Sequence, residues 1–421
     1  MKASPVVEGI DWVGAIDWNL RDFHGYETPH GTTYNAYLVK GDDKVALIDT
    51  VKIPFVPELL ERIKSIMPLE KIDYIVVNHI EPDHNGGMRM VAEACPNAKL
   101  VASAGGVRGI AEYHGPDIHV DPVGPDSVID LGGKTLRFLP MPMVHWPDSM
   151  FTYCPECKVL MPNDAFGQHV ASSERFADEL GQRLALDEMA EYYANILMPL
   201  GKQVCKAIEK VVANGWELDV IAPSHGVAWR GSMVHTAIDY LSMLASGKTS
   251  DKLIIAYSTM WGSTDVLARE IADGAAETGI DVEVYDLAVA AYSHIMKEMM
   301  DARALLLGSP TLHHGMLHRV AGFLQYVAGL KPADKIAGVF GSYGWSSGAT
   351  KQMQGRLEEI GFGMPEPDFT EKFRPTAEDL DAARQWGRAF GEHVIAMGKG
   401  VDVMAEAAAK ADAAAKAEAA E

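Results

Sequence analysis

Residues 73–87, DYIVVNHIEPDHNGG, decide both the fold and the chemistry of this 421-residue chain. The run YIVV at 74–77 is short, β-branched and apolar on both faces, which predicts a buried strand. Four side chains of the types that bind metal ions follow it: His79, Glu81, Asp83 and His84. Alternate residues of an extended segment share a face, so the first two point the same way, and a turn at Pro82 can bring the other two round beside them. The pattern predicts two neighbouring metal ions at the end of a strand.

Composition and charge narrow the class of protein. The chain is 48% hydrophobic and 23% charged, which is typical of a globular protein long enough for two or three domains. Its 37 basic and 58 acidic residues give a net charge of −21, which argues against binding to nucleic acid or to an anionic membrane. We see no apolar signal core at the N-terminus and no run of about eighteen apolar residues, so we expect a cytoplasmic protein without a membrane segment.

The four cysteines are too few for a disulfide framework. Two of them, Cys154 and Cys157, form a CPEC motif between two strand-like runs. Such a pair can be half of a thiolate metal site or a redox dithiol, but the chain has no second CxxC and the motif does not open a helix. We therefore interpret the motif as a hairpin turn.

Three more candidate ligands each follow a predicted strand in the N-terminal half. His145 comes after the strand at 135–139, Asp164 after the strand at 158–161, and His225 after the strand at 219–222. Each alone is an ordinary loop residue, but all three repeat one arrangement: a strand, then a single candidate ligand, then a small or turn residue. A two-sheet α/β sandwich can gather a metal site along one edge from such loops. Further elements predicted in this half are strands at 12–17, 32–40 and 44–50 and helices at 56–66 and 186–214.

A small and polar segment at 246–251 marks a predicted boundary between a domain at 1–249 and a second domain at 250–398. In the second domain, predicted strands at 253–257, 281–287, 304–307 and 336–340 alternate with predicted helices at 265–278, 294–300 and 349–360. This alternation predicts a doubly wound parallel sheet, which binds ligands outside the carboxyl ends of its strands. Residues 399–421 are an Ala-rich C-terminal tail, for which we expect a solvated helix.

The loops after three of these strands predict a site for flavin mononucleotide (FMN). The loop at 258–264 offers hydroxyls at a helix N-terminus, where backbone N–H groups favour a phosphate, and it lacks the lysine of a triphosphate-binding loop. Aromatic side chains in the same loops supply flat walls for a flat ring. The candidate contacts are Ser258, Thr259, Met260, Trp261, Gly262, Ser263, Thr264, Pro310, Thr311, Leu312, His313, Ser342, Tyr343, Gly344, Trp345 and Gly348.

Taken in order along the chain, these motifs resemble those of the flavodiiron proteins, in which a metallo-β-lactamase-like αββα sandwich is fused to a flavodoxin-like domain. The resemblance covers the chain up to about residue 398 and rests on NHIEPDHNGG, VHWPDSM, NDAFGQH, SHG, YSTMWGSTD, GSPT and GSYGWSSG. It implies one iron on His79, Glu81 and His145, and a second iron on Asp83, His84 and His225. It also implies Asp164 as the bridge between the two irons and suggests His24 and Tyr193 as catalytic residues over the diiron pocket.

The resemblance implies a diiron and FMN oxidoreductase that reduces dioxygen to water, nitric oxide to nitrous oxide, or both. It also implies a head-to-tail homodimer, or a dimer of such dimers. Hydrolases of the same superfamily carry HxHxDH and mostly zinc, whereas this chain has Glu81 in place of the second histidine. Because a carboxylate stabilises ferric over ferrous iron, the substitution favours a redox metal over a hydrolytic one.

Two alternatives stay open: a zinc-dependent metallo-hydrolase fused to a flavodoxin-like electron-transfer module, and a flavodoxin-like electron carrier with an inert sandwich domain. The electron donor is open as well, because we find neither the two CxxC pairs of a rubredoxin module nor an NADH-binding domain. A separate rubredoxin-like protein or a reduced deazaflavin coenzyme would fit. His313 and His314 lie near the expected flavin ring, where protonated imidazoles could shift its potential, unless they are only exposed loop residues.

Overall fold

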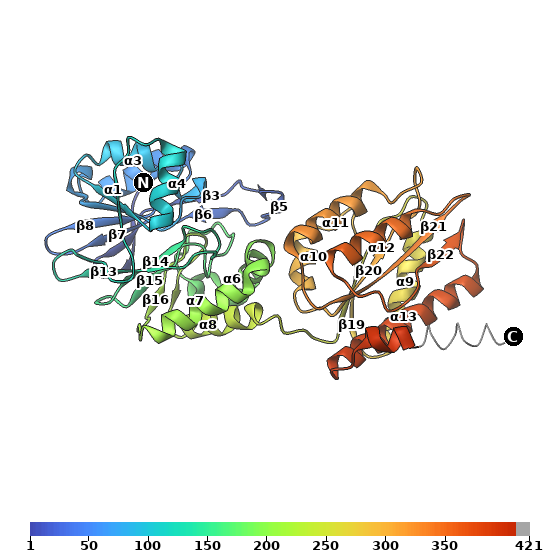
Figure 1. The fold of residues 1–421 in the computed structure, drawn as a ribbon. Coiled ribbons are helices and arrows are strands. Elements are labelled where there is room, and N and C mark those ends of the chain that lie inside the picture. The colour runs from blue at the N-terminus through green and yellow to red at the C-terminus, as the bar shows by residue number, and fades with distance from the viewer. Residues whose placement is uncertain (410–421) are drawn as a thin grey trace. The chain divides into compact units, whose positions relative to one another are not determined.

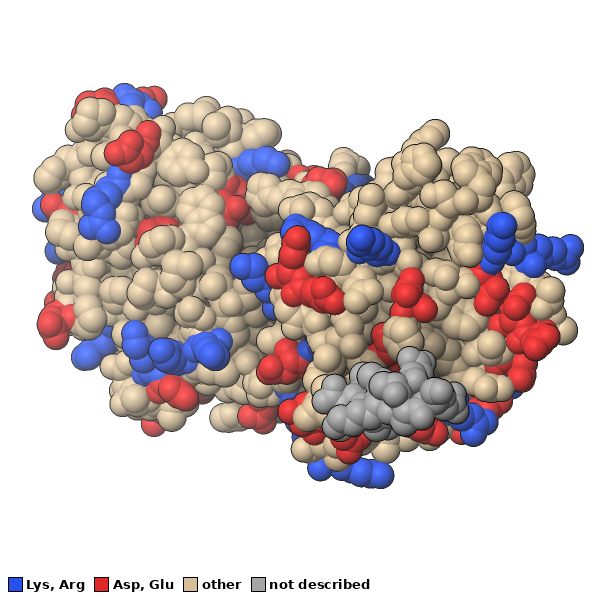
Figure 2. Space-filling model, turned by 45° about the vertical axis from the view of Figure 1, so that its right-hand side comes forward, with Lys and Arg blue, Asp and Glu red and all other residues tan. Residues whose placement is uncertain are grey.

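The structure is a computed structural model that describes residues 1–409, and its chain forms two units, Met1–Ser246 and a second that begins at Gly247 (Figure 1). Of the Ala-rich tail, residues 410–421 lie outside the described part. Within residues 1–409, no helix is both long and apolar enough to cross a membrane. On the face drawn in Figure 2, acidic and basic side chains are interspersed among uncharged ones rather than gathered into one patch of either sign.

Two sheets form the centre of the first unit. The first sheet has the strand order β1 (Ser4–Val7), β2 (Ile10–Trp12), β7 (Tyr37–Lys40), β8 (Val45–Ile48), β9 (Tyr74–Val77), β10 (Lys99–Ala102) and β11 (Val120–Pro122). The second has the order β12 (Val128–Asp130), β13 (Thr135–Pro140), β14 (Met150–Cys154), β15 (Val159–Met161), β16 (Val220–Ile221) and β17 (Trp229–Arg230). Buried side chains of both sheets share one core cluster, in which Ile48 and Val76 of the first accompany Phe138 and Met161 of the second.

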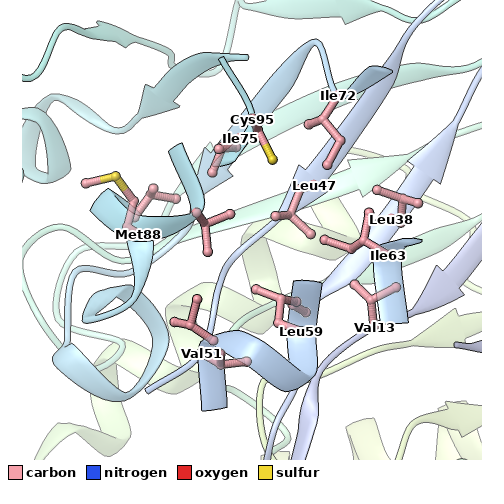
Figure 3. Close-up of a cluster of buried hydrophobic side chains, with 14 of the residues drawn as sticks. Val13, Leu38, Leu47, Val51, Leu59, Ile63, Ile72, Ile75, Met88 and Cys95 are labelled. Atoms are coloured by element: carbon pink, nitrogen blue, oxygen red, sulfur yellow. The ribbon is translucent and has the colours of Figure 1, made fainter. Parts of the chain in front are cut away.

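Helices cover the outer face of each sheet. On the first sheet, α1 (Val56–Lys64) buries Leu59 and Ile63, one helical turn apart, in a cluster with Leu38 and Leu47 of the strands (Figure 3). The same cluster includes residues of α3 (Met88–Ala94) and α4 (Ala104–His114). On the second sheet, α7 (Gly201–Ala213) and α8 (Ser232–Ala245) lie over β14 and β15. This is the αββα sandwich expected from the sequence.

Three expected elements of the first unit are divided in the structure. The strand expected at 12–17 is split between β2 in the first large sheet and β3 (Ala15–Asp17) in a separate two-stranded sheet. The single strand at 32–40 is wrong: β6 (Thr32–Tyr34) pairs with β3 (Ala15–Asp17), whereas β7 belongs to the first large sheet. Asn35 separates them because its side-chain amide donates to the carbonyls of Pro223 and Gly226 at 2.8 and 3.0 Å. These hydrogen bonds join the chain at Asn35, between the two strands, to the loop that carries His225.

The single helix expected at 186–214 is also wrong. It consists of α6 (Gln182–Tyr192), a π-helical turn η3 (Tyr193–Leu197), a 3₁₀ turn η4 (Met198–Leu200) and α7. Pro199 lies in the 3₁₀ turn, where its ring and missing N–H interrupt the ladder of helical hydrogen bonds. The interpretation of the CPEC motif as a hairpin turn is confirmed, because β14 and β15 pair antiparallel with Cys154 opposite Val159.

The second unit is a five-stranded parallel sheet with the order β19 (Asp281–Asp286), β18 (Lys252–Tyr257), β20 (Ala304–Gly308), β21 (Ile336–Tyr343) and β22 (Phe369–Lys372). The expected doubly wound sheet is confirmed. Its helices are α9 (Ser263–Ala276), α10 (Tyr292–Met299), α11 (His318–Leu330), α12 (Ala349–Ile360) and α13 (Ala377–Gly398). Helices α9 and α13 pack so closely that a Cβ atom on Gly274 would lie 1.9 Å from the carbonyl oxygen of Arg384. Only glycine permits this contact.

Candidate metal centre and nucleotide pocket

Seven side chains from both sheets of the first unit meet where their strands end. His79 and Glu81 follow β9, while Asp83 and His84 lie on the single turn α2 (Pro82–Asn85). The second sheet contributes one side chain after each of three strands: His145 after β13, Asp164 after β15 and His225 after β16. His145 is partly exposed and the other six residues are buried. The structure thus brings together all seven residues that the sequence suggested as metal ligands.

The seven side chains form two sets, one of His79, Glu81, His145 and Asp164 and one of Asp83, His84 and His225, each with ligand atoms within 4.8 Å of one another. In the first set, Oε2 of Glu81 lies 3.2 Å from Nε2 of His79 and 3.1 Å from Nε2 of His145. In the second, Oδ2 of Asp83 lies 3.1 Å from Nε2 of His225. Each set offers the nitrogen and oxygen donors that suit iron or zinc.

Asp164 links the two sets through its two carboxylate oxygens. Its Oδ2 lies 3.2 Å from Nε2 of His145 and 3.5 Å from Nε2 of His79, in the first set. Its Oδ1 lies 3.0 Å from Nε2 of His84 and 3.7 Å from Nε2 of His225, in the second. One carboxylate that faces two ligand sets is the arrangement that holds two metal ions side by side.

The donor atoms of these sets fit metal ions because several of them make no hydrogen bond and lie against other donor atoms of the sets. Both carboxylate oxygens of Asp83, both ring nitrogens of His84 and Oδ2 of Asp164 are buried without a hydrogen bond to any described residue. Burying polar atoms without partners is costly, and coordination to a metal ion would remove that cost. The residues present therefore fit a pair of metal ions.

Without metal, the carboxylates hold protons on the histidines. Burial disfavours the charged ring of His79, but hydrogen bonds to Asp148 and Glu81 outweigh it and raise the pKa of His79 to about 10. Burial opposes the charge on His84 as well, yet Asp83 and Asp164 raise the pKa of His84 to about 9. The neighbouring imidazoles in turn keep the pKa of Asp164 well below its ordinary value despite its burial. The centre is a network of paired charges that metal ions can replace.

Polar groups behind the sets fix the orientation of the ligands. Nδ1 of His79 lies 3.0 Å from Oδ2 of Asp148, which also accepts a hydrogen bond from the backbone N–H of Ile80 at 2.8 Å. Nδ1 of His225 lies 2.6 Å from the carbonyl oxygen of Thr33. Each contact leaves Nε2 facing the centre, as is usual for histidines that bind metals.

His24 reaches the centre from a separate hairpin. It lies between β4 (Asp22–Phe23) and β5 (Tyr26–Glu27), and its Nε2 is 3.2 Å from Oε1 of Glu81. Its side chain is 70% exposed. An imidazole in contact with both solvent and a candidate ligand can carry protons between them.

Tyr193, suggested as a catalytic residue, has its hydroxyl beside Gly201 at the start of α7. Its neighbour Tyr192 has its ring centroid 5.9 Å from that of His225, a candidate ligand. A helix turns about 100° per residue, so the two side chains point in different directions. The catalytic role of Tyr193 stays a prediction, and Tyr192 is a second candidate that the sequence reasoning did not select.

His169 is a residue that the sequence reasoning missed. Its ring is buried with centroids 4.7 Å from His225 and 4.9 Å from Tyr192, and its Nδ1 lies 2.7 Å from Oγ1 of Thr32. Burial and the charge of His225 keep the pKa of His169 well below its ordinary value. It closes the motif NDAFGQH, so its place five residues after Asp164 was the available signal.

The second unit has a pocket at the carboxyl ends of β18, β20 and β21, with a volume of about 990 Å³. Thirteen of the sixteen residues suggested for FMN line it: Thr259, Met260, Trp261, Gly262, Ser263, Pro310, Thr311, Leu312, His313, Ser342, Tyr343, Gly344 and Trp345. The rings of Trp261 and Trp345 stand out at its rim, 94% and 90% exposed. The N-terminus of α9 opens into it with hydroxyls beside it, so the pocket fits a phosphate and a flat ring.

The other three suggested residues lie behind the lining. Ser258 and Thr264 are buried, and the Thr264 hydroxyl lies 3.1 Å from the hydroxyl of Ser342. A Cβ atom on Gly348 would lie 2.4 Å from the carbonyl oxygen of His314, so this glycine allows two loops to meet. Residues of the loop between β22 and α13, and one residue of α13, line the pocket and were missed by the sequence reasoning: Phe373, Arg374, Pro375 and Leu380.

His313 and His314 form the centre of a tight turn in which Leu312 and Gly315 exchange backbone hydrogen bonds of 2.9 Å. Both have positive φ angles, 50° and 64°. Residues other than glycine and asparagine rarely adopt this backbone conformation. Both also line the pocket. Their effect on a flavin stays a prediction.

A sandwich with a paired metal centre, joined to a flavodoxin-type sheet with a nucleotide pocket, defines a class of metalloflavoproteins. Family models agree with each half: one described as ODP family beta lactamase matches residues 32–226, and one described as flavodoxin matches residues 255–387. The chain is 42% identical over 393 residues to the nitric oxide reductase of Moorella thermoacetica, covering 92% of this chain and 98% of that protein.

Other proteins are similar over comparable lengths. The rubredoxin-oxygen oxidoreductase of Megalodesulfovibrio gigas is 42% identical over 384 residues, which are 90% of this chain and 95% of that protein. The coenzyme F420H2 oxidase of Methanothermobacter marburgensis is 37% identical over 406 residues, which are 94% of this chain and 100% of that protein. The solved structure of the Giardia intestinalis flavodiiron protein has a TM-score of 0.88 and 35% identity over 94% of this chain and 97% of that one. The chain belongs to the flavodiiron protein family.

Proposed function

We propose that this chain is a diiron and FMN oxidoreductase that reduces dioxygen to water, nitric oxide to nitrous oxide, or both. The observation that carries the proposal is the position of Asp164, whose two oxygens face two ligand sets. Two metal ions held by this carboxylate would be close enough for one diatomic molecule to touch both. The similarity to a nitric oxide reductase and to a rubredoxin-oxygen oxidoreductase supports the same reaction class.

The proposed ligands of the two irons correspond to the two sets of neighbouring side chains. His79, Glu81 and His145 would hold one iron, and Asp83, His84 and His225 the other, with Asp164 between them. The FMN phosphate would lie at the N-terminus of α9, and the ring between the aromatic side chains at the rim of the pocket. When bound, two ferrous ions and one reduced flavin hold four electrons, which is the number needed to reduce dioxygen to two waters.

The chain's own groups supply the protons and the shape of the centre. Water formation consumes protons, and we propose that His24 delivers them, because its ring contacts both solvent and Glu81. Asp148 and the carbonyl of Thr33 keep Nε2 of their histidines directed at the metals. Tyr192 and His169 close one side of the centre with buried rings.

Glu81 is the feature that favours this reaction over hydrolysis by a zinc enzyme. It lies at the position where the sequence of a hydrolase of this superfamily would have the second histidine. Its carboxylate adds negative charge to the first ligand set, which stabilises ferric iron. Burial opposes the charge on Glu81, but hydrogen bonds from His145 and His79 outweigh it and hold the pKa of Glu81 well below its ordinary value, so the side chain carries this charge over the whole neutral range.

The electron donor and the assembly are proposed from the relatives. The names of two relatives point to a rubredoxin and to coenzyme F420H2, which is a reduced deazaflavin, and this chain would take its electrons from a donor of one of these kinds. We propose a head-to-tail homodimer in which the flavin of one chain serves the irons of the other, as the family resemblance implies.

The test starts with the metal and flavin content of the purified chain, followed by anaerobic reduction and stopped-flow mixing with dioxygen or nitric oxide. We expect about two irons and one FMN per chain, and oxidation by at least one gas much faster than that of free flavin. A matched variant, Glu81→His, should retain less iron and react more slowly. Two zinc ions, with a flavin that reoxidises slowly, would instead support the zinc-dependent hydrolase.

A further inference from the structure

The first unit contains an apolar cavity of about 30 Å³ between the second sheet and its helices. Phe151 of β14 and Leu160 of β15 line it from the sheet, and side chains of α7 and α8 line it from the helices. All thirteen lining residues are apolar. A cavity needs roughly 10–15 Å³ to hold one water molecule, and this one has about twice that volume, which is room for a diatomic gas.

Three residues that line the cavity adjoin candidate ligands in the sequence. Val144 precedes His145, and Ala165 and Phe166 follow Asp164. The lining also includes Val212 of α7, which is 70% exposed. The cavity therefore borders the loops that carry two of the candidate ligands.

The chemistry of the lining selects the occupant. A buried water needs two to four polar partners, and no polar residue lines this cavity. Protein interiors are otherwise close-packed, because side chains around an empty space lose contacts with their neighbours. Genuinely empty cavities in proteins are apolar, and an engineered one of about 150 Å³ stays dry and binds benzene or xenon. Dioxygen and nitric oxide are small, uncharged and weakly polar, so they suit the same space.

We propose that this cavity is a binding site for small apolar gases and that it supplies dioxygen or nitric oxide to the metal centre. The identity of the gas rests on the proposed function, whereas the affinity for apolar gases rests on the cavity alone. Ala207 of α7 lines the cavity and is buried, so a larger side chain there would fill it. Ala213 ends the same helix and is exposed, and provides a matched control.

The first experiment is a crystal structure of the holoprotein under xenon pressure, for the wild type, Ala207→Leu and Ala213→Leu. We expect a xenon atom in the cavity of the wild type and of Ala213→Leu, and none in Ala207→Leu. Absence of xenon from the wild-type cavity would overturn the proposal. This result does not depend on activity, so it stands apart from any failure of the proposed function.

The second experiment measures, by stopped flow, the second-order rate constant for oxidation of each reduced protein by dioxygen and by nitric oxide. We expect it to fall several-fold in Ala207→Leu, while the rate of flavin reduction by the donor and the metal content stay unchanged. Ala207→Val adds less volume, so it should fold if the larger variant does not, and it should show a smaller decrease. Loss of xenon binding with wild-type oxidation rates would refute the role of the cavity in supply.

Discussion

Asp148 offers a sharp test of how the metal centre is held, because it supports a ligand without belonging to either ligand set. Its Oδ2 receives both the ring N–H of His79, at 3.0 Å, and the backbone N–H of Ile80, at 2.8 Å. The substitution Asp148→Asn keeps the size of the side chain and removes its charge. We expect weaker binding of the metal ion nearest His79.

The size of the effect follows from these contacts. Hydrogen bonds to a charged group contribute about 1.5–3 kcal/mol, and neutral ones about 0.5–1.5 kcal/mol. The loss of charge therefore costs about 1–2 kcal/mol at His79, and each 1.4 kcal/mol is a factor of about ten in affinity. We expect roughly a fivefold to thirtyfold loss, which overlaps the range of about 10- to 100-fold known for groups that support metal ligands.

The assay is an anaerobic titration of the metal-free protein with ferrous iron against a competing chelator, analysed for two sites. One site should weaken by the stated factor, while the site of Asp83, His84 and His225 changes much less. Asp49→Asn is a matched control for the site of His79, since Asp49 is similarly buried and accepts a hydrogen bond from the backbone N–H of Asn78 at 2.7 Å, while its charge acts on His84 of the other set. Unchanged affinity at both sites, or an equal loss in the control, would refute the reasoning.

Three other predictions follow from single contacts. A hydrogen bond from the Cys154 thiol lowers the pKa of Cys157 to about 7. The rate of Cys157 alkylation by iodoacetamide, followed by mass spectrometry, should therefore fall as the pH drops below neutrality. A midpoint of this pH dependence near the pKa of a free thiol would contradict the prediction. Gly274→Ala should destabilise the second unit by about 1–3 kcal/mol through overpacking against α13. Gly329→Ala, where a Cβ atom meets nothing within 4 Å, should instead stabilise it by about 0.5–1 kcal/mol, and calorimetry distinguishes the two. Tyr192→Phe should slow oxidation by the substrate gas, whereas Tyr193→Phe should not; equal stopped-flow rates in the two variants would count against the position of Tyr192 at the centre.

The sequence predicted the positions of the ligands well because the relevant signals are local. A strand end fixes where the next side chain can point, and this rule places Glu81 beside His79 within one short segment. The same rule, applied to single residues after distant strands, brought Asp164 and His225 to the same centre once the sheets had formed. Alternation of strands and helices likewise predicted the doubly wound sheet from local patterns alone.

The errors arose where a local pattern does not determine the outcome. Periodicity cannot locate a π-helical turn, so one helix was expected from 186 to 214, through the interruption at 193–200. His169 lies near His225 only because loops from distant parts of the chain meet around Thr32. The break at Asn35 depends on carbonyl groups nearly two hundred residues away, which no short window of sequence contains.

The division of the ligands between the two sheets makes metal supply a determinant of folding as well as of activity. His79 and Asp83 belong to loops of the first sheet, whereas His145, Asp164 and His225 belong to loops of the second. Metal ions bound here would fasten one half of the sandwich to the other, and a ligand that binds only the folded state adds about 2.7 kcal/mol of stability at a hundred times its dissociation constant. In cells starved of iron, newly made chains would therefore be easier to unfold and to degrade. The abundance of the protein would then follow the iron available to it, without any separate regulator.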